Sequence, residues 1–327
     1  MRSRAAVVMS LTLAVGVGCV EPATAASAFR FVGSGGVTSD GIRYAAVPKQ
    51  GDPVLIFDTA RRRSFRLPPP LPPSTAKCDF TAIGAGQAVW TCSSPATASY
   101  SFDRRPVPIL TDLATRSSRG VAGAQNLFRC PQVACAPFGH TYSGIGRAWI
   151  RVDTFSFFGT YYLSRTTGEV RRGGDGPRTQ PDLDRSALVR RICRPVRRPA
   201  LPGVDGGPSR VQVDIEGRSV LLPASGIGPQ RRPLQLFRCG KRRPRVLSRC
   251  RPTPCESSGL SAGVVTWAQG NRVWSYRLRT RRRKLVGSLP VGSFPPGAPL
   301  LGVARTRTRV FAVALQRQVV YVARLPR

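Results

Sequence analysis

Short runs of apolar and β-branched residues recur along the chain, and turn-forming residues separate them. Apolar residues at helical spacing are nearly absent, and 30 prolines and 33 glycines interrupt the sequence throughout. Runs of this length, rich in β-branched and aromatic residues and bounded by turns, are typical of short strands. The pattern predicts an all-β protein with strands in VLIFD (54–58), QAVWTC (87–92), RAWIRV (147–152), TYYLS (160–164), SVLLP (219–223), LQLF (234–237), GVVTWA (263–268), RVWSYRL (272–278), RVFAVAL (309–315) and VVYVARL (319–325).

The predicted strands recur as a module of two hairpins. In the first hairpin, CDFTAIGAGQAVW (78–90) aligns with CESSGLSAGVVTW (255–267) without a gap, and CAPFGHTYSGIGRAW (135–149) is a third copy with two extra residues. The second hairpin carries basic residues in or beside its turn, and its five versions are 54–67, 99–110, 160–172, 234–247 and 273–286. Four-stranded modules of about 40–50 residues are typical of β-propellers.

We therefore expect residues 29–327 to form a single β-propeller of about six four-stranded blades, within a range of five to seven. The last module, VVYVARLPR (319–327), lacks a returning strand, and FRFVG (29–33) is expected to supply it and close the ring. The alternative is two β-sandwich-like domains, divided in the poorly patterned region 173–210.

The first 28 residues have the layout of a secretory signal peptide. Arg2 and Arg4 precede an apolar stretch over 5–17, and small residues follow. The apolar stretch is shorter than the roughly 20 residues of a membrane-spanning helix. We expect 1–28 to be a signal peptide, and the mature protein to be exported, with no transmembrane segment. Lipid anchoring at Cys19 is the alternative.

Eight cysteines follow this segment, and an even number in an exported chain indicates disulfides. Cys78 and Cys92 are equidistant from Ala85, so a three-residue loop at 84–86 would place them opposite each other on adjacent strands. The short spacings predict two more bonds, and the remaining cysteines form the fourth pair. The predicted disulfides are Cys78–Cys92, Cys130–Cys135, Cys250–Cys255 and Cys193–Cys239.

Catalytic and metal-binding patterns are weak. The single histidine, His140, is placed in a loop and leaves no second candidate for a catalytic triad. The acids at 175–184 lack the spacing of a calcium loop, and the G-x-G sequences at 84–86 and 144–146 lead into strands, which excludes a dinucleotide site. We expect no cofactor, no metal site and no enzymatic activity. One alternative is a propeller-type carbohydrate-active enzyme, a glycosidase or lyase that uses an unidentified carboxylate pair. The other is a scaffold that binds another exported protein.

The strongest chemical signal is basic charge. The chain has 51 basic and 16 acidic residues, a net charge of +35, and this excess attracts anionic polymers. Arginines at matching places in the modules predict a repeated basic rim, which either keeps the strand edges soluble or binds phosphate and carboxylate groups. Few aromatic residues accompany them, so specific nucleic-acid binding is not expected. The candidate anion-binding residues are Arg61, Arg62, Arg63, Arg104, Arg105, Arg171, Arg172, Arg242, Arg243, Arg281, Arg282 and Arg283.

The third strand and its turn, as in FDTARRR (57–63) and LSRTTGEV (163–170), resemble secreted bacterial β-propeller repeat proteins of the TolB-like and YVTN-like kinds. The resemblance implies a closed ring of sheets with ligand sites on its faces, and it implies no particular activity. We expect a monomeric, non-enzymatic binding module of the cell envelope. Its expected partner is an anionic envelope polymer or another exported protein.

Overall fold

A computed structural model describes the parts of the chain that follow, and the structural statements below concern these residues. They are 29–48, 53–70, 77–93, 107–124, 140–154, 160–172, 193, 214–222, 224, 233–241, 243–251, 253, 255–289, 301–314 and 318–326. The predicted signal peptide lies outside them, as do the Cys130–Cys135 pair and the acids at 175–184.

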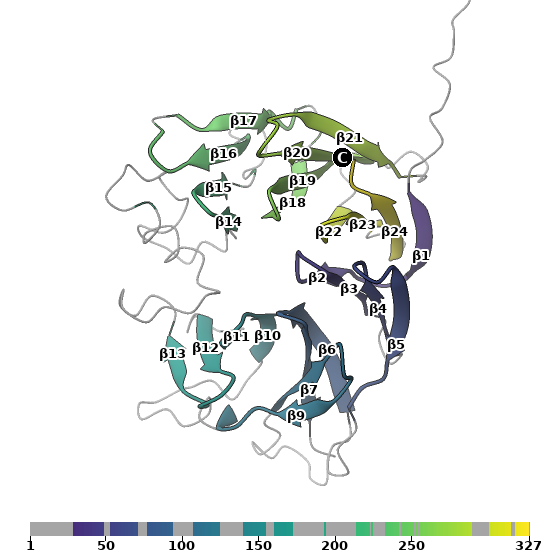
Figure 1. The fold of residues 1–327 in the computed structure, drawn as a ribbon, viewed down its shortest axis with the longest axis vertical. Helices are drawn as coiled ribbons and strands as arrows, with labels where there is room; N and C mark the ends of the chain where they lie inside the picture. Colours follow the sequence, from purple (N-terminus) through teal and green to yellow (C-terminus); the bar gives the residue numbers. More distant parts are fainter. Residues whose placement is uncertain are drawn as a thin grey trace, which may run out of the picture.

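Six four-stranded antiparallel sheets stand around a common centre and form a six-bladed β-propeller (Figure 1). The innermost strands of consecutive sheets contact each other, as β2 contacts β6 and β22, and β18 contacts β14 and β22. From the innermost strand outward, the sheets are β2 (Thr38–Ser39), β3 (Tyr44–Val47), β4 (Val54–Asp58) and β5 (Arg63–Leu67); β6 (Lys77–Gly84), β7 (Gln87–Ser93), β8 (Val107–Asp112) and β9 (Ser118–Gly120); β10 (His140–Ile145), β11 (Trp149–Thr154), β12 (Thr160–Ser164) and β13 (Val170–Arg172); β14 (Asp214–Glu216), β15 (Ser219–Leu222), β16 (Leu234–Arg238) and β17 (Arg245–Ser248); β18 (Cys255–Ser261), β19 (Val264–Gln269), β20 (Arg272–Arg277) and β21 (Arg283–Ser288); β22 (Leu301–Arg305), β23 (Arg309–Ala314), β24 (Val319–Arg324) and β1 (Arg30–Ser34).

The ring closes through its first and last strands, as predicted. β1 is the outer strand of the sheet that also contains β22, β23 and β24, and it pairs antiparallel with β24. Phe31 lies opposite Tyr321 in this pairing, and their rings meet edge to face at 6.3 Å between centroids. The first and the last described strands therefore lie side by side in one sheet, and their pairing closes the ring.

The hydrophobic core lies between neighbouring sheets. One cluster joins residues of the β2–β5 and β6–β9 sheets, and it contains Ile56 and Trp90. Another joins the β14–β17 and β18–β21 sheets around Leu221 and Trp267. The two tryptophans are almost fully buried, and the indole N–H of Trp90 donates to Thr111 Oγ1 at 3.0 Å. Large rings therefore fill the space between blades, as such residues do in cores.

The inner hairpin β6–β7 has a two-residue turn instead of the three-residue loop that the cysteine spacing predicted. Gly84 pairs with Gln87, and Ala85 and Gly86 take positive φ values of 47° and 75°. A register shift between Phe80 and Ala82 inserts one unpaired residue into β6. This bulge offsets the shorter turn, so the pairing of Cys78 with Cys92 is still direct. The aligned turn of β18–β19 has the same geometry, with φ values of 46° at Ala262 and 69° at Gly263.

Every strand predicted from a quoted segment is present, but one hairpin prediction was wrong. Residues 99–110 do not form a third–fourth strand hairpin, because β8 begins at Val107 and its returning strand β9 begins at Ser118. The prediction was based on the sequence FDRR at 102–105, which resembles the end of a third strand and its basic turn. The acid that ends the third strand is instead Asp112, since Val107–Asp112 pairs with β7 along its whole length.

Three predicted disulfides are present: Cys78–Cys92, Cys193–Cys239 and Cys250–Cys255. Cys250 follows β17 and Cys255 opens β18, so their bond closes a short loop between two blades, as expected. Cys193 lies in a turn, ahead of the β14–β17 sheet, whose first strand begins at Asp214, and its bond joins it to Cys239 directly after β16. His140, expected in a loop, is the first residue of β10.

Candidate functional site: a basic turn face and a pocket at its edge

The same backbone hydrogen bond occurs once in every blade. The N–H that follows the third strand donates to a carbonyl of the turn between the first and second strands, at 2.9–3.0 Å. This bond holds the third–fourth turn beside the first–second turn, so both lie at the same end of their sheet. The six pairs are Thr59 to Arg43, Leu113 to Gly86, Arg165 to Ala148, Cys239 to Arg218, Leu278 to Gly263 and Leu325 to Thr308.

Contacts between sheets bring these ends together. The N–H of Arg307 donates to the carbonyl of Ile42 at 2.9 Å, which joins the first–second turns of two neighbouring sheets. The N–H of Gly263 likewise donates to Glu216 at 2.6 Å. The guanidinium of Arg165 hydrogen-bonds to Gln87 in the preceding sheet. We call the surface made by these turns the turn face. Its first–second turns are 40–43, 85–86, 146–148, 217–218, 262–263 and 306–308. Its third–fourth turns are 59–62, 113–117, 165–169, 239–241 with 243–244, and 278–282.

The turn face is strongly basic. Its described residues include two acids, Asp40 and Glu169. The Oδ1 atom of Asp40 accepts the backbone N–H groups of Ile42, Arg43 and Tyr44. Glu169 pairs with Arg171 at 2.7 Å. Both carboxylates are therefore used within the protein. The described basic residues of these turns are Arg43, Arg61, Arg62, Arg116, Arg147, Arg165, Arg218, Lys241, Arg243, Arg279, Arg281, Arg282 and Arg307.

Two third strands end in an aspartate that holds the following turn. Asp58 is buried, and Arg43 donates to its two oxygens at 2.8 and 2.6 Å. The hydrogen bonds from Arg43 lower the pKa of Asp58 to about 2. Asp112 accepts N–H groups from Ala114 and Thr115, and these bonds lower its pKa as well. Both carboxylates therefore accept hydrogen bonds from the turns that follow their strands.

The structure places the predicted candidate residues in different surroundings. Arg61, Arg62, Arg243, Arg281 and Arg282 lie in third–fourth turns. The remaining described candidates, Arg63, Arg171, Arg172 and Arg283, lie in fourth strands. Arg104 and Arg105 belong to the connection between β7 and β8 and not to a third–fourth turn, and they lie outside the described residues, as does Arg242.

Sequence reasoning missed Arg116, which takes the place of Arg62 in the next blade. Both residues have positive φ, 64° and 54°, and each lies four positions after the aspartate that ends its third strand. The signal was present in the sequence, because DTAR at 58–61 and DLAT at 112–115 share the aspartate and the alanine.

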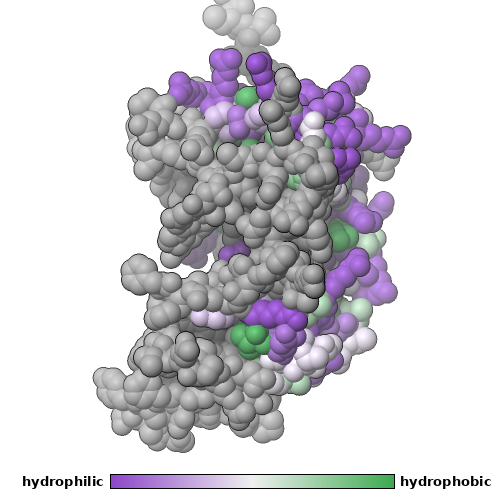
Figure 2. All heavy atoms as spheres, turned by 90° about the vertical axis from the view of Figure 1, so that its left-hand side faces the viewer, coloured by the Kyte–Doolittle hydropathy of each residue, from purple (hydrophilic) through white to green (hydrophobic). Residues whose placement is uncertain are grey.

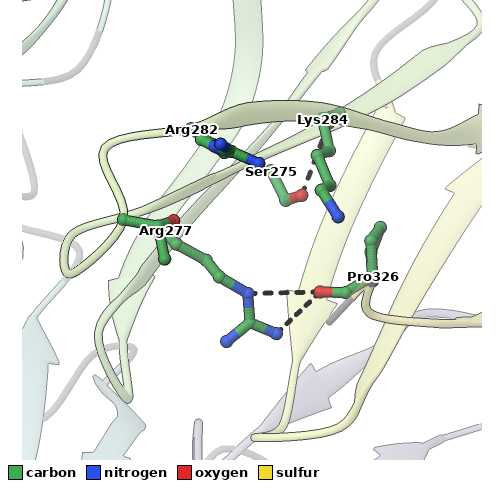
Figure 3. A pocket seen from close by; sticks show the side chains of 6 residues that line it. Ser275, Arg277, Arg282, Lys284 and Pro326 are labelled. Atoms are coloured by element: carbon green, nitrogen blue, oxygen red, sulfur yellow. Dashed lines mark hydrogen bonds between the residues drawn. The ribbon is translucent and has the colours of Figure 1, made fainter.

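A pocket of about 130 Å³ lies at the β20–β21 hairpin, at the edge of the turn face. Figure 3 shows Arg277 and Lys284 reaching from the two strands towards Pro326 near the end of the chain. Arg277 donates to the carbonyl oxygen of Pro326 from Nε at 3.2 Å and from Nη2 at 2.6 Å. The described residues that line the pocket are Ser275, Arg277, Thr280, Arg282, Lys284 and Pro326.

Strand alternation separates the basic residues of this hairpin. Ser275 lies opposite Lys284, and one position on, Tyr276 lies opposite Arg283. Successive side chains point to opposite faces of a sheet, so Lys284 lines the pocket while Arg283 turns to the other face. There Arg283 lies over Trp274 at 3.9 Å and over Trp267 at 5.4 Å, and partial burial lowers its pKa.

Hydrophilic residues dominate the described surface in Figure 2, with isolated hydrophobic residues between them. Ile42 and Phe31 are among the exposed large hydrophobic residues, and they lie on different elements. Within the described ranges, no group of three or more histidine, cysteine or acidic side chains is arranged to hold a metal ion. The same ranges contain no helix that could span a membrane.

Comparisons with known proteins find similar folds at low identity. No protein-family model and no curated protein matches the chain. Similar solved structures include the β-propeller domain of the trilobed protease from Pyrococcus furiosus, at 10% identity and a TM-score of 0.45, covering 90% of this chain and 96% of that chain. A nidogen/laminin complex has 9% identity and a TM-score of 0.38, with 84% and 86% covered. Oligogalacturonate lyase in complex with manganese has 10% identity and a TM-score of 0.35, with 89% and 78% covered.

Proposed function

We propose that this protein is an exported, non-enzymatic binding module whose turn face contacts an anionic polymer of the cell envelope. The observation that carries the proposal is the excess of basic side chains on one face, whose two turn acids are already engaged in the protein. A polymer with repeated anionic groups can meet many of these side chains at once. Each weak interaction then adds to the total affinity.

The compartment is consistent with this partner. Three disulfides join described cysteines, and disulfides persist in oxidising, extracytoplasmic environments. The net charge of +35 also favours rapid, salt-dependent association with any polyanion. A test of the proposal must therefore separate the turn face from the overall charge.

Equivalent positions in three blades allow such a test. Arg62, Arg116 and Arg281 all have positive φ in a third–fourth turn, and all three are exposed. The test variant is Arg62→Gln, Arg116→Gln and Arg281→Gln combined. The control variant combines Arg66→Gln, Arg249→Gln and Arg272→Gln, which are exposed and lie outside the turn face. Both variants lose three positive charges.

Both variants and the wild type are eluted from immobilised heparin with a salt gradient, after their thermal unfolding shows that they are folded. When binding releases counterions, the logarithm of the binding constant falls linearly with the logarithm of salt concentration. The slope of this line is smaller when fewer anionic groups are neutralised. The turn-face variant is expected to elute at lower salt than the control, with a smaller slope. Elution of the two variants at the same salt concentration would show that overall charge, and not the turn face, binds the polymer.

A further inference from the structure

We infer that the pocket of the β20–β21 hairpin binds one tetrahedral oxyanion, the phosphoryl or sulfo group of an anionic ligand. The inference rests on the proposed function and specifies its ligand chemistry at one place. The described residues that line the pocket include three cations, Arg277, Arg282 and Lys284, and no acid.

One of the cations in the described lining, Arg277, occupies a position that holds an acid in two other blades. Arg277 ends the third strand of its blade, and the N–H of the next residue makes the bond that recurs in every blade. In two other blades this position holds an aspartate, Asp58 or Asp112, which accepts hydrogen bonds from its turn. Here an arginine replaces the acid, and the position adds a positive charge to the pocket instead of a negative one.

Arg277 is held in place for binding. Two of its N–H groups donate to the carbonyl oxygen of Pro326, which fixes the guanidinium at the pocket wall. An arginine that is already oriented loses less side-chain freedom when a ligand binds. Lys284 comes from the facing strand β21 and Arg282 from the turn just before it, so the cations approach the cavity from two sides.

The dimensions of the pocket suit a small charged group. Its volume of about 130 Å³ leaves room for a single phosphoryl or sulfo group. The aromatic residues Trp274 and Tyr276 lie on the other face of the sheet, and the described residues that line the pocket include no aromatic side chain on which a ring could stack.

The donors favour a tetrahedral anion over a carboxylate. Arginine offers N–H groups in a planar fork, and lysine offers a compact charge with three donors. A carboxylate has two oxygens in one plane and satisfies a single fork. A phosphoryl or sulfo group presents three or more oxygens in different directions, which suits cations that approach from two strands.

The test measures binding of inorganic phosphate to the full protein at constant ionic strength, held with chloride, by isothermal titration calorimetry. Sulfate and acetate are titrated in the same way. Wild type is expected to bind one phosphate saturably, sulfate within a few-fold of it, and acetate at least tenfold more weakly. The pocket variant Arg282→Gln with Lys284→Gln is expected to bind phosphate at least tenfold more weakly.

The matched control is Arg249→Gln with Arg272→Gln, which removes the same charge away from the pocket and is expected to keep phosphate affinity within twofold. Equal losses in the two variants, or no saturable binding to folded wild type, would overturn the inference. Acetate binding as tight as phosphate would overturn the assigned ligand class. If the phosphate titration fails but the Arg62, Arg116 and Arg281 variant elutes from heparin at lower salt than its control, the pocket inference alone is refuted. If wild type binds phosphate saturably but the two heparin variants elute at the same salt concentration, the polymer proposal alone is refuted.

Discussion

The guanidinium carbon of Arg283 lies 3.9 Å from the centroid of the Trp274 ring, on the face of the β18–β21 sheet away from the pocket. Its neighbours in sequence, Arg282 and Lys284, line the pocket on the opposite face. Three consecutive basic residues therefore have two different roles. Arg283 packs against aromatic rings, and the other two present charge to a cavity.

This division predicts opposite phenotypes for adjacent substitutions. Arg283→Gln removes the cation–π interaction and is expected to lower the free energy of unfolding by about 1 kcal/mol, with phosphate affinity unchanged. Arg282→Gln is expected to weaken phosphate binding and to leave stability nearly unchanged, because its side chain is exposed. Urea denaturation and phosphate titration of both variants measure the two effects. Weaker phosphate binding in Arg283→Gln than in Arg282→Gln would contradict the assignment.

The ion pair between Arg43 and Asp58 is expected to be the most sensitive interaction of the β2–β5 sheet. Asp58→Asn leaves the guanidinium without its carboxylate. Because Asp58 is buried but Arg43 is partly exposed, the loss is expected to be about 2 kcal/mol, less than for a fully buried pair. Asp112→Asn is the matched control at the same position of the next blade. Asparagine can still accept the turn N–H groups there, so a loss of about 1 kcal/mol or less is expected. Chemical denaturation of both variants at pH 7 tests the difference, and similar losses would refute it.

The same pair predicts a loss of stability in acid. The pKa of Asp58 is lowered from 3.8 to about 2 in the folded protein. As the pH falls, the unfolded chain takes up this proton first, so stability is full above pH 4 and decreases between pH 4 and pH 2. The shift corresponds to about 2 kcal/mol. The difference in unfolding free energy between wild type and Asp58→Asn should narrow over this range, and a constant difference would contradict the assignment.

The disulfides are expected to differ in their contribution to stability according to the length of chain they close. Their sequence separations are 46 for Cys193–Cys239, 14 for Cys78–Cys92 and 5 for Cys250–Cys255. Loop-closure entropy of the unfolded chain gives about 4, 3 and 2 kcal/mol in that order. Paired Cys→Ala variants, compared by thermal unfolding under oxidising conditions, test the order. The reverse order would show that chain entropy does not dominate.

Two glycines of one turn separate close packing from backbone conformation. A Cβ on Gly84 would lie 2.2 Å from the carbonyl oxygen of Ile145 in the next blade, so Gly84→Ala must displace backbone. We expect a loss of about 3 kcal/mol. Gly86 has a φ of 75° and open space around its Cβ position, so Gly86→Ala costs about 1 kcal/mol in backbone strain. Urea midpoints of the two variants test this ranking, which equal losses would disprove.

Local sequence patterns were sufficient for most of the fold. Alternating strands, paired turns and the repeat of 78–90 at 255–267 predicted the inner hairpins, and both are present. The missing strand of the last blade was predicted from the count of strands alone. The hairpin at 99–110 was wrongly predicted because the sequence FDRR at 102–105 resembles the strand end and turn FDTARRR at 57–63. The strand that pairs with β7 is instead Val107–Asp112.

The sequence alone determined most of the strands, because they depend on residue type and turn chemistry over a few residues. It also determined the three disulfide pairs among described cysteines, which followed from cysteine spacing and number. The tertiary structure decided which arginines meet each other and which meet aromatic rings. The run of basic residues 281–284 reads as one patch in the sequence, yet alternation sends Arg283 to Trp274 and Lys284 to the pocket. The contacts on the two faces of the β20–β21 hairpin depend on the neighbouring blade and on Pro326. These are far away in the sequence, and the closing of the ring brings them to the hairpin.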